Sequence, residues 1–299
     1  MLPEDVLDRY LKAGRIASEV RREAEKLVRG ETPILQICNT VENSIRRRGG
    51  EPAFPCNVCV NDIAAHYSSP PKDVRTIPKD SLVKVDLGVH VEGYVADTAT
   101  TVCLNPQYDG MVHAVNDALE QAIGAIKPKT KTSEIGRIVQ KTIESYGFKP
   151  IRNLSGHQME RYILHTGKSV PNVSSFGFQS IDEGEVYAVE PFLTLASGGG
   201  EVRGAKDAYI YRFQKERRLD NPEAEKLLKS IKTNYRLLPF SMRWIKGIEE
   251  KTTREAFDEL ITNRCVSSYP VLVEVAGGII AQAEHTVIVT GKGCIVTTR

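Results

Sequence analysis

Residues 84–98 read Lys-Val-Asp-Leu-Gly-Val-His-Val-Glu-Gly-Tyr-Val-Ala-Asp-Thr. Strong β-formers on both sides of a glycine-containing turn are typical of a β-hairpin. With the turn centred on Val91-Glu92, as we expect, Asp86 lies directly opposite Asp97 on one face of the ladder. Two such carboxylates repel each other and lose solvation, and residues 85–102 contain no Lys or Arg to offset them. The hairpin therefore predicts a divalent cation at Asp86 and Asp97; a shifted register with one exposed Asp is the alternative.

The hairpin lies between two copies of one helical pattern. Apolar residues every three or four positions predict helices over 4–29 and, after Thr32 as N-cap and Pro33 as first helical residue, from 34 to Gly49-Gly50. The same pattern predicts helices over 109–127 and 131–146. A shift of 98 positions gives identities at the cap, the apolar face, the stop and the next turn: Thr32/Thr130, Ile37/Ile135, Val41/Val139, Ile45/Ile143, Gly49/Gly147 and Pro52/Pro150. We infer an internal duplication of a helix–helix–strand unit.

The predicted strands cluster at 82–104 and 271–296 instead of alternating with helices, which favours an α+β fold with a largely antiparallel sheet. Residues 203–270 do not belong to the duplication and are predicted to be mostly helical. They carry 15 Lys and Arg against 10 Asp and Glu, a net charge of +5, whereas the rest of the chain carries −3. This segment is either a solvated helical insertion or a docking surface for an acidic partner such as ribosomal RNA.

Composition excludes several classes of protein. A net charge of +2 over 299 residues argues against a dedicated nucleic-acid binder, so we expect no direct DNA binding. The N-terminus resembles no signal peptide, and no run of about 18 apolar residues predicts a membrane span. Six cysteines are few for a disulfide scaffold and suit a reducing cytoplasm. The isolated pair Cys56 and Cys59 lacks a second ligand pair, so two small residues in a strand are the simpler interpretation.

Three further segments place ligand-type side chains among apolar neighbours. His157 and His165 are eight residues apart, which puts them on one face of an extended segment. Glu190 and Glu284 each lie in an apolar, strand-like stretch, where a glutamate needs a partner. Taken singly, a structural histidine or a structural ion pair explains each of them; together with Asp86 and Asp97 they favour two adjacent divalent ions.

The remaining histidines differ in their claims to a function. His66 follows a loop rich in Asn and Pro and is a candidate for substrate contact or proton transfer. His90 near the hairpin turn and His113 at a helix start have weaker claims. His285 neighbours Glu284, so on a strand it faces the opposite way.

At this point the sequence resembles the methionine aminopeptidases, and more narrowly the type II subfamily in its short archaeal form. The resemblance covers nearly the whole chain and rests on an ordered set of motifs. These are Pro52-Ala-Phe-Pro, Ala64-Ala-His-Tyr, Asp86 with Asp97, Ser155-Gly-His157, Glu190-Pro-Phe and Gln282-Ala-Glu284-His. Ala283 departs from the family's pattern, which often has an aromatic residue before the last ligand glutamate.

The resemblance implies the pita-bread fold of the creatinases and aminopeptidases. That fold has two pseudo-symmetric halves, a curved antiparallel sheet and outer helices. Residues 1–202 and 271–299 would form the catalytic domain, and residues 203–270 the helical insertion subdomain of type II members. The implied activity is removal of the initiator methionine from nascent chains, with a small second residue preferred.

The resemblance also implies a role for each site residue. Two divalent metal ions, whether cobalt, manganese, iron or zinc, would be held by Asp86, Asp97, His157, Glu190 and Glu284. In this arrangement Asp86 is bidentate to one metal, Asp97 and Glu284 bridge the two, and His157 and Glu190 complete the other. Glu190 would also move protons.

Substrate contacts are implied as well. His66 and His165 would contact the scissile peptide, and Phe54 would line the methionine pocket. A monomeric, cytoplasmic enzyme is expected, with ribosome association through the basic insertion as an open option. A prolidase or aminopeptidase P of the same fold is the nearest alternative, although residues 1–50 leave no room for its separate N-terminal domain. A non-catalytic homologue that binds peptides or ribosomes is the other.

Overall fold

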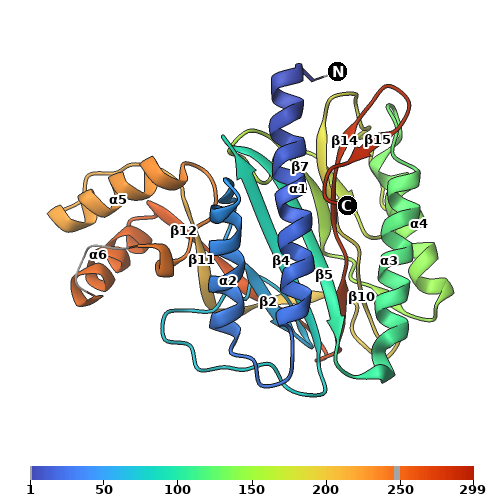
Figure 1. The fold of residues 1–299 in the computed structure, drawn as a ribbon, viewed down its shortest axis with the longest axis horizontal. Coiled ribbons are helices and arrows are strands. Elements are labelled where there is room, and N and C mark those ends of the chain that lie inside the picture. The colour runs from blue at the N-terminus through green and yellow to red at the C-terminus, as the bar shows by residue number, and fades with distance from the viewer. Residues whose placement is uncertain (1, 246–249) are drawn as a thin grey trace.

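The computed structural model describes residues 2–245 and 250–299, which form two related halves and an appended lobe (Figure 1). The first half contains α1 (Glu4–Leu27), α2 (Ile34–Arg47), β1 (Glu51–Pro52), β2 (Asn57–Val60), β3 (Ile63–Ala65), β4 (Leu82–Val91) and β5 (Tyr94–Cys103). A short 3-10 helix, η1 (Pro106–Tyr108), leads into the second half. That half contains α3 (Asp109–Gly124), α4 (Thr132–Ser145), β6 (Lys149–Pro150), β7 (Ser155–Met159), β8 (Ser169–Pro171), β9 (Val186–Val189) and β10 (Phe192–Thr194).

The rest of the chain builds the lobe and then returns to the second half. The lobe consists of β11 (Val202–Phe213), α5 (Pro222–Tyr235), η2 (Met242–Trp244), α6 (Glu250–Thr262) and β12 (Val266–Glu274). The chain ends with β13 (Ile280–Gln282), β14 (His285–Val289) and β15 (Cys294–Val296). None of the helices among the described residues is both long and apolar enough to cross a membrane.

The duplication is confirmed by the element bounds. Helix α4 begins and ends 98 positions after α2, and β6 lies 98 positions after β1. Gly49 and Gly147 adopt the same left-handed backbone after these helices, with φ of 77° and 80°. One detail of the prediction is wrong: Pro33, and not Thr32, is the N-cap residue of α2. Thr32 lies one residue earlier, where its backbone carbonyl accepts a hydrogen bond from the Ile77 amide.

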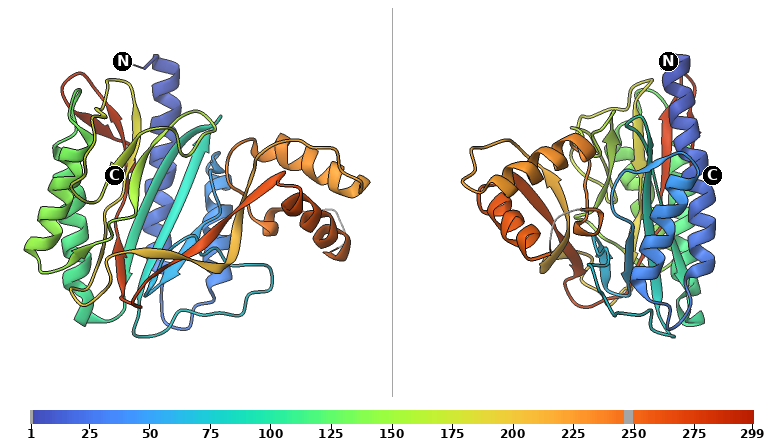
Figure 2. Two further views of the ribbon diagram at one scale, coloured as in Figure 1. Left: turned by 180° about the vertical axis from the view of Figure 1, so that it is seen from behind. Right: turned by 60° about the vertical axis from the view of Figure 1, so that its left-hand side comes forward.

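The strands form antiparallel sheets whose outer face is covered by helices. In the first half β4 pairs with β1, β2 and β5, and in the second half β9 lies between β14 and β7. Helices α1 and α2 pack on the first half through one apolar core, and α3 and α4 on the second through another. Figure 2 shows α1 and α2 on one side of the central strands and α5 and α6 on the other. The α+β, pita-bread arrangement predicted from the sequence is confirmed.

The register of the β4–β5 hairpin differs from the prediction by two residues. The two turn residues are Glu92 and Gly93, with φ of 52° and 92°, and not Val91 and Glu92. A two-residue hairpin turn favours positive φ at both central positions, which a β-branched valine disfavours and glycine accepts. Asp86 is therefore opposite Ala99, and Asp97 opposite Gly88. Because the shift is an even number of residues, both carboxylates still lie on one face.

The segment 203–270 contains the expected helices α5 and α6, with their own apolar core. Its ends are not helical, because β11 and β12 pair with each other along most of their length. Strand β12 also pairs with β3, which attaches the lobe to the first half. Both strands run through the predicted boundaries at 203 and 270, so that division of the chain stays a prediction.

Candidate metal centre

A cavity of about 250 Å³ opens on the inner face of the sheets. Its walls come from both halves and from the lobe. All eight candidate site residues named from the sequence line it: Phe54, His66, Asp86, Asp97, His157, His165, Glu190 and Glu284. Residues separated by as many as 230 positions in the sequence thus meet at one site.

Strand pairing between the halves places the acidic residues. Asp86 and Asp97 come from β4 and β5, and Glu284 lies between β13 and β14. An isolated bridge pairs Ala99 with Glu284, and the Thr98 hydroxyl donates to the Glu284 carbonyl at 2.9 Å. The Asp97 amide donates to the Thr286 hydroxyl oxygen at 2.7 Å. These bonds hold the Asp97 and Glu284 segments together, and one of them uses Thr98 of the Thr-rich run that follows Asp97.

His157 faces two of these carboxylates. It lies on β7, and its Nε2 is 3.7 Å from Asp97 Oδ2 and 3.6 Å from Glu190 Oε1. Asp97, His157 and Glu284 each offer a ligand atom, and these atoms lie within 4.8 Å of one another. Glu190, which follows β9, also accepts a hydrogen bond from the side-chain amide of Gln282, whose Nε2 lies 3.4 Å from Glu190 Oε2.

The cluster holds acceptors without matching donors. Among the described residues, the buried atoms Asp86 Oδ1, Asp97 Oδ1 and Glu284 Oε2 have no hydrogen-bond partner. Burial raises the pKa of Asp86 to about 7. Burial, and then the neighbouring carboxylates, raises the pKa of Asp97 and of Glu284 well above the usual range.

Burial also lowers the pKa of His157 well below its usual value, so its imidazole is neutral and can act as a ligand. Several carboxylate oxygens beside one neutral imidazole form a donor set that suits divalent cations. The buried acceptors of Asp86, Asp97 and Glu284 give these cations a place to bind. The residues therefore fit the metal binding predicted from the sequence.

Two further histidines line the cavity beside these carboxylates. His66 has a left-handed backbone, with φ of 66°, and its Nδ1 lies 3.1 Å from the Pro270 carbonyl oxygen. A carbonyl only accepts, so Nδ1 carries the proton and Nε2 keeps a lone pair. The His165 ring centroid is 4.2 Å from that of His157. Burial lowers the pKa of His66, and it lowers the pKa of His165 to about 4, so both rings are uncharged at neutral pH.

Sequence reasoning missed the contribution of the lobe to the cavity wall. Ile210 on β11, Pro239 before η2 and Tyr269 on β12 all line it. The Tyr269 ring is 5.4 Å from His66 and 6.4 Å from His165. The β-rich run Val-Ser-Ser-Tyr-Pro-Val-Leu-Val over 266–273 was the available signal for this strand.

The other histidines and the cysteine pair are not among the residues that line this cavity. His285 points to the opposite side, as expected, with its Nδ1 2.8 Å from the Thr298 hydroxyl. His113 is exposed on α3. Cys56 and Cys59 are buried, free thiols in the core of the first half. In the part of the chain that the structure describes, neither belongs to a cluster of potential metal ligands.

Comparison with known proteins agrees with this geometry. The pattern of metallopeptidase family M24 matches residues 8–291. The methionine aminopeptidase of Methanocaldococcus jannaschii is 47% identical over 292 residues, which cover 98% of each chain. That of Methanothermobacter thermautotrophicus is 45% identical over 98% of this chain and 99% of its own.

Solved structures share the fold at low sequence identity. A thermophilic Arx1 superimposes with a TM-score of 0.84 at 17% identity, over 99% of this chain and 91% of its own. The methionine aminopeptidase of Rickettsia prowazekii superimposes with a TM-score of 0.72 at 18% identity, over 100% of this chain and 99% of its own. The prolidase of Pyrococcus furiosus gives a TM-score of 0.63 at 17% identity, and only 64% of that chain is covered. On the fold, the ligand cluster and the full-length identity, this chain belongs to metallopeptidase family M24 and, within it, to the archaeal-type methionine aminopeptidases.

Proposed function

We propose that this aminopeptidase removes N-terminal methionine from nascent polypeptides with two divalent metal ions. Asp86, Asp97, His157, Glu190 and Glu284 would hold the ions. The observation that carries this proposal is the meeting of all five ligand-type side chains in one cavity. Bound there, such ions lower the pKa of a water molecule and polarise a carbonyl, which is the chemistry of peptide hydrolysis. The donor set suits cobalt, manganese, iron and zinc alike, and availability selects among them.

The residues around the ions would bind the peptide and move the proton. We assign Glu190 to carry a proton from the attacking water to the leaving amine, because its carboxylate faces His157 in the buried cluster. His66 lines the cavity, and its Nε2, which keeps a lone pair, would accept a hydrogen bond from an amine or a peptide N–H. His165, uncharged and beside His157, would contact the scissile peptide and stabilise the tetrahedral species.

The apolar part of the wall would bind the methionine side chain. Phe54, Leu164, Ile210 and Pro239 line the cavity together with the metal ligands. A cavity of about 250 Å³ is small for a peptide site, which supports one enclosed side chain and a small second residue.

The peptide activity has a direct test. We expect hydrolysis of Met-Ala-Ser, loss of activity with a chelator, and recovery on adding a divalent metal. N-acetyl-Met-Ala-Ser and a dipeptide such as Leu-Pro serve as controls and should remain intact. Turnover of the Leu-Pro control in place of Met-Ala-Ser would contradict the proposal.

We also propose that the lobe associates with ribosomes. Its basic residues support this, since Arg217, Lys229, Lys232 and Arg236 line a groove with Arg161, against two acidic residues. Replacing exposed Arg217 and Lys229 with Glu should reduce co-sedimentation with ribosomes and weaken its salt dependence, while Met-Ala-Ser hydrolysis stays at the wild-type rate. Unchanged co-sedimentation would contradict docking through the lobe.

We further propose that the enzyme is a monomer of the cytoplasm. One chain supplies every residue of the cavity wall named above, and the six cysteines are free thiols, as suits a reducing compartment. Sedimentation equilibrium at micromolar concentration should give the mass of one chain, 33.2 kDa.

A further inference from the structure

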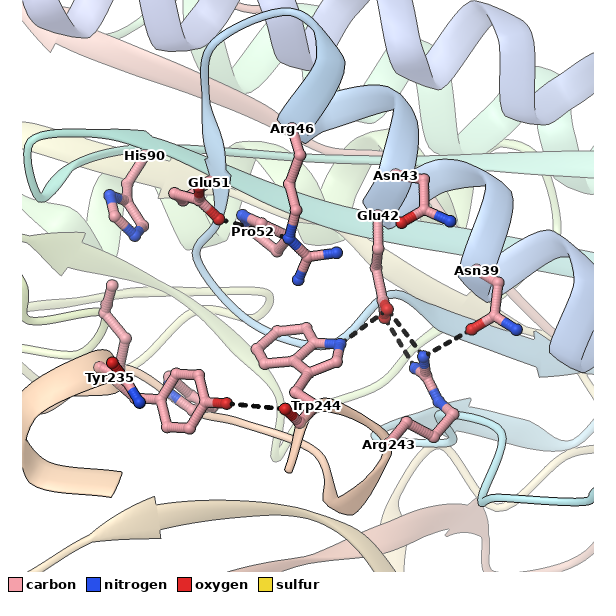
Figure 3. Close-up of a pocket in the computed structure, with 13 residues that line it drawn as sticks. Asn39, Glu42, Asn43, Arg46, Glu51, Pro52, His90, Tyr235, Arg243 and Trp244 are labelled. Carbon is pink, nitrogen blue, oxygen red and sulfur yellow. Dashed lines mark hydrogen bonds and ion pairs between the residues drawn. The ribbon is translucent and has the colours of Figure 1, made fainter. Parts of the chain in front are cut away.

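Behind the wall of the catalytic cavity, a buried ion pair joins the lobe to the first half. Glu42 on α2 and Arg243 in η2 are 201 positions apart in the sequence. Their side chains are 3% and 6% exposed, and two guanidinium nitrogens each lie 2.7 Å from a carboxylate oxygen (Figure 3). A bidentate ion pair is directional, so besides attracting the lobe to α2 it fixes the orientation of Arg243 relative to that helix.

The Glu42 carboxylate accepts hydrogen bonds from two separate segments of the chain, η2 and the residues just before β2. Besides Arg243, it accepts from the Cys56 backbone amide at 3.1 Å and from Trp244 Nε1 at 2.7 Å. Cys56 follows Phe54 by two residues, and Phe54 lines the catalytic cavity. The carboxylate therefore connects α2 both to the lobe and to the cavity wall.

The Arg243 guanidinium holds a second segment of that wall. Its Nε donates to the Ser69 carbonyl at 2.7 Å, and a terminal nitrogen donates to the Ser68 hydroxyl at 3.0 Å. Both serines are fully buried, and His66 lies two residues before Ser68. Pro239, which lines the cavity from the lobe, lies four residues before Arg243 itself.

Packing alone does not set the distance between α2 and the lobe at this point. A second cavity of about 620 Å³ lies between them, lined by α2 and by residues of the lobe such as Tyr235 and Trp244 (Figure 3). Pro239 lines both this cavity and the catalytic one. Across this space the Glu42–Arg243 pair is the bidentate, directional contact that sets the spacing, and the Arg46 guanidinium lies over the Trp244 ring at 5.5 Å beside it.

We propose that Glu42, Arg243 and Trp244, here called the hub, position the walls of the methionine pocket and thereby set its selectivity. The hub acts through Phe54 and Pro239, and none of its three members is among the residues that line the catalytic cavity. Its members are positioning residues, since they reach the substrate only through the segments they hold. This inference rests on the proposed function, in which the apolar part of the cavity wall binds the methionine side chain of the substrate.

The experiment compares Glu42→Gln and Arg243→Lys with the wild-type enzyme on Met-Ala-Ser and Leu-Ala-Ser. We expect KM for Met-Ala-Ser to rise roughly tenfold with little change in kcat, and the preference for Met over Leu to fall by a similar factor. Trp244 is the single tryptophan of the chain, so a shift in its fluorescence emission reports directly that the hub has loosened. Inhibition by free methionine should weaken in parallel with the rise in KM.

Arg48→Ala is the matched control. Arg48 follows the same helix and is bonded to Glu23 and Glu19 on α1, and neither of these lines the cavity. This variant should lower the melting temperature while KM and the Met preference stay at wild-type values.

The outcomes separate the two proposals. Hub variants that shift the Trp244 emission but keep the wild-type KM and Met preference would overturn the positioning role. If Glu42→Gln does not fold, Arg243→Lys, which keeps the positive charge, decides the question with the same measurements. A folded, metal-loaded wild-type enzyme that fails to cleave Met-Ala-Ser would overturn the proposed function instead.

Discussion

Asp86 and Asp97 lie diagonally across the β4–β5 ladder, on one face, with Ala99 and Gly88 as their respective partners. The offset separates the two carboxylates along the strand direction. Ala99, the partner of Asp86 and two residues after Asp97, forms an isolated β-bridge with Glu284, which brings the third carboxylate to the same place. Among the described residues, Asp86 Oδ1, Asp97 Oδ1 and Glu284 Oε2 are buried acceptors without a hydrogen-bond partner, which leaves them available to a cation.

The first prediction concerns metal binding. In Asp97→Asn, one carboxylate oxygen of the cluster becomes an amide nitrogen that cannot act as a ligand, so bound metal should fall and kcat/KM should drop by roughly 100-fold or more. Metal content after dialysis, measured by elemental analysis, checks this. Glu120→Gln, an exposed change on α3, is the control and should retain both metal and activity. A D97N variant with full metal content and activity would remove Asp97 from the ligand set.

The second prediction separates substrate contacts from ligands. His66→Ala and His165→Ala should keep the metal content of the wild type and lose turnover by roughly 100-fold, because each removes a group that we propose acts on the peptide. His113→Ala, on the exposed face of α3, should change neither quantity. Loss of metal in either active-site variant would reassign that histidine as a ligand.

The third prediction tests the packing beneath Phe54. A Cβ added at Gly88 would overlap the Phe54 ring, with Cδ1 at 2.7 Å and the Ala53 Cβ at 3.0 Å. Gly88→Ala should therefore raise KM for Met-Ala-Ser and lower the stability by about 1–3 kcal/mol.

Gly124→Ala is the control for this change. The new Cβ would meet no heavy atom within 4 Å in the described structure, and Gly124 ends α3. Since alanine replaces glycine in a helix, stability should rise by up to about 1 kcal/mol with KM unchanged. A wild-type KM and melting temperature in Gly88→Ala would show that the Phe54 ring is not tightly held.

The fourth prediction concerns pH and the buried carboxylate of Glu274. Burial alone would raise the pKa of Glu274, but backbone amides outweigh it and hold the pKa below the usual value. The amides of Gly200, Ala276 and Gly278 donate at 3.0, 2.8 and 2.8 Å. Because the folded pKa is lowered, the ionised group stabilises the protein above its ordinary pKa of about 4.5, and this contribution is lost as the pH falls through the folded value.

Glu274→Gln should accordingly cost about 1–3 kcal/mol at pH 7, and the difference from the wild type should shrink below about pH 4.5. Urea unfolding at a series of pH values, with metal removed from both proteins by a chelator, measures it. Glu120→Gln provides the baseline for an exposed carboxylate. A difference that stays constant from pH 7 to pH 3 would mean that ionisation of Glu274 contributes nothing.

The duplication and the helices were predictable because they rest on local signals. The apolar periodicity of 34–47 and 132–145 and the glycines that end each segment are fixed by residues a few positions apart. The hairpin register was wrong by two residues because turn chemistry decides it: Glu92 and Gly93 take the positive φ that Val91 disfavours. The face that carries both aspartates survived this error, since side chains alternate with a period of two.

By itself, the sequence determined the halves and the pita-bread fold, and it named the candidate ligands that line one cavity. Only the tertiary structure decided which residues form the rest of that site, such as Tyr269 from β12, and which contacts hold it, such as the pairing of Glu42 with Arg243. The physical reason is range. Periodicity and turns act over a few residues, whereas a cavity wall and a buried ion pair arise when segments some 200 positions apart pack together, and that proximity leaves no mark in either segment alone.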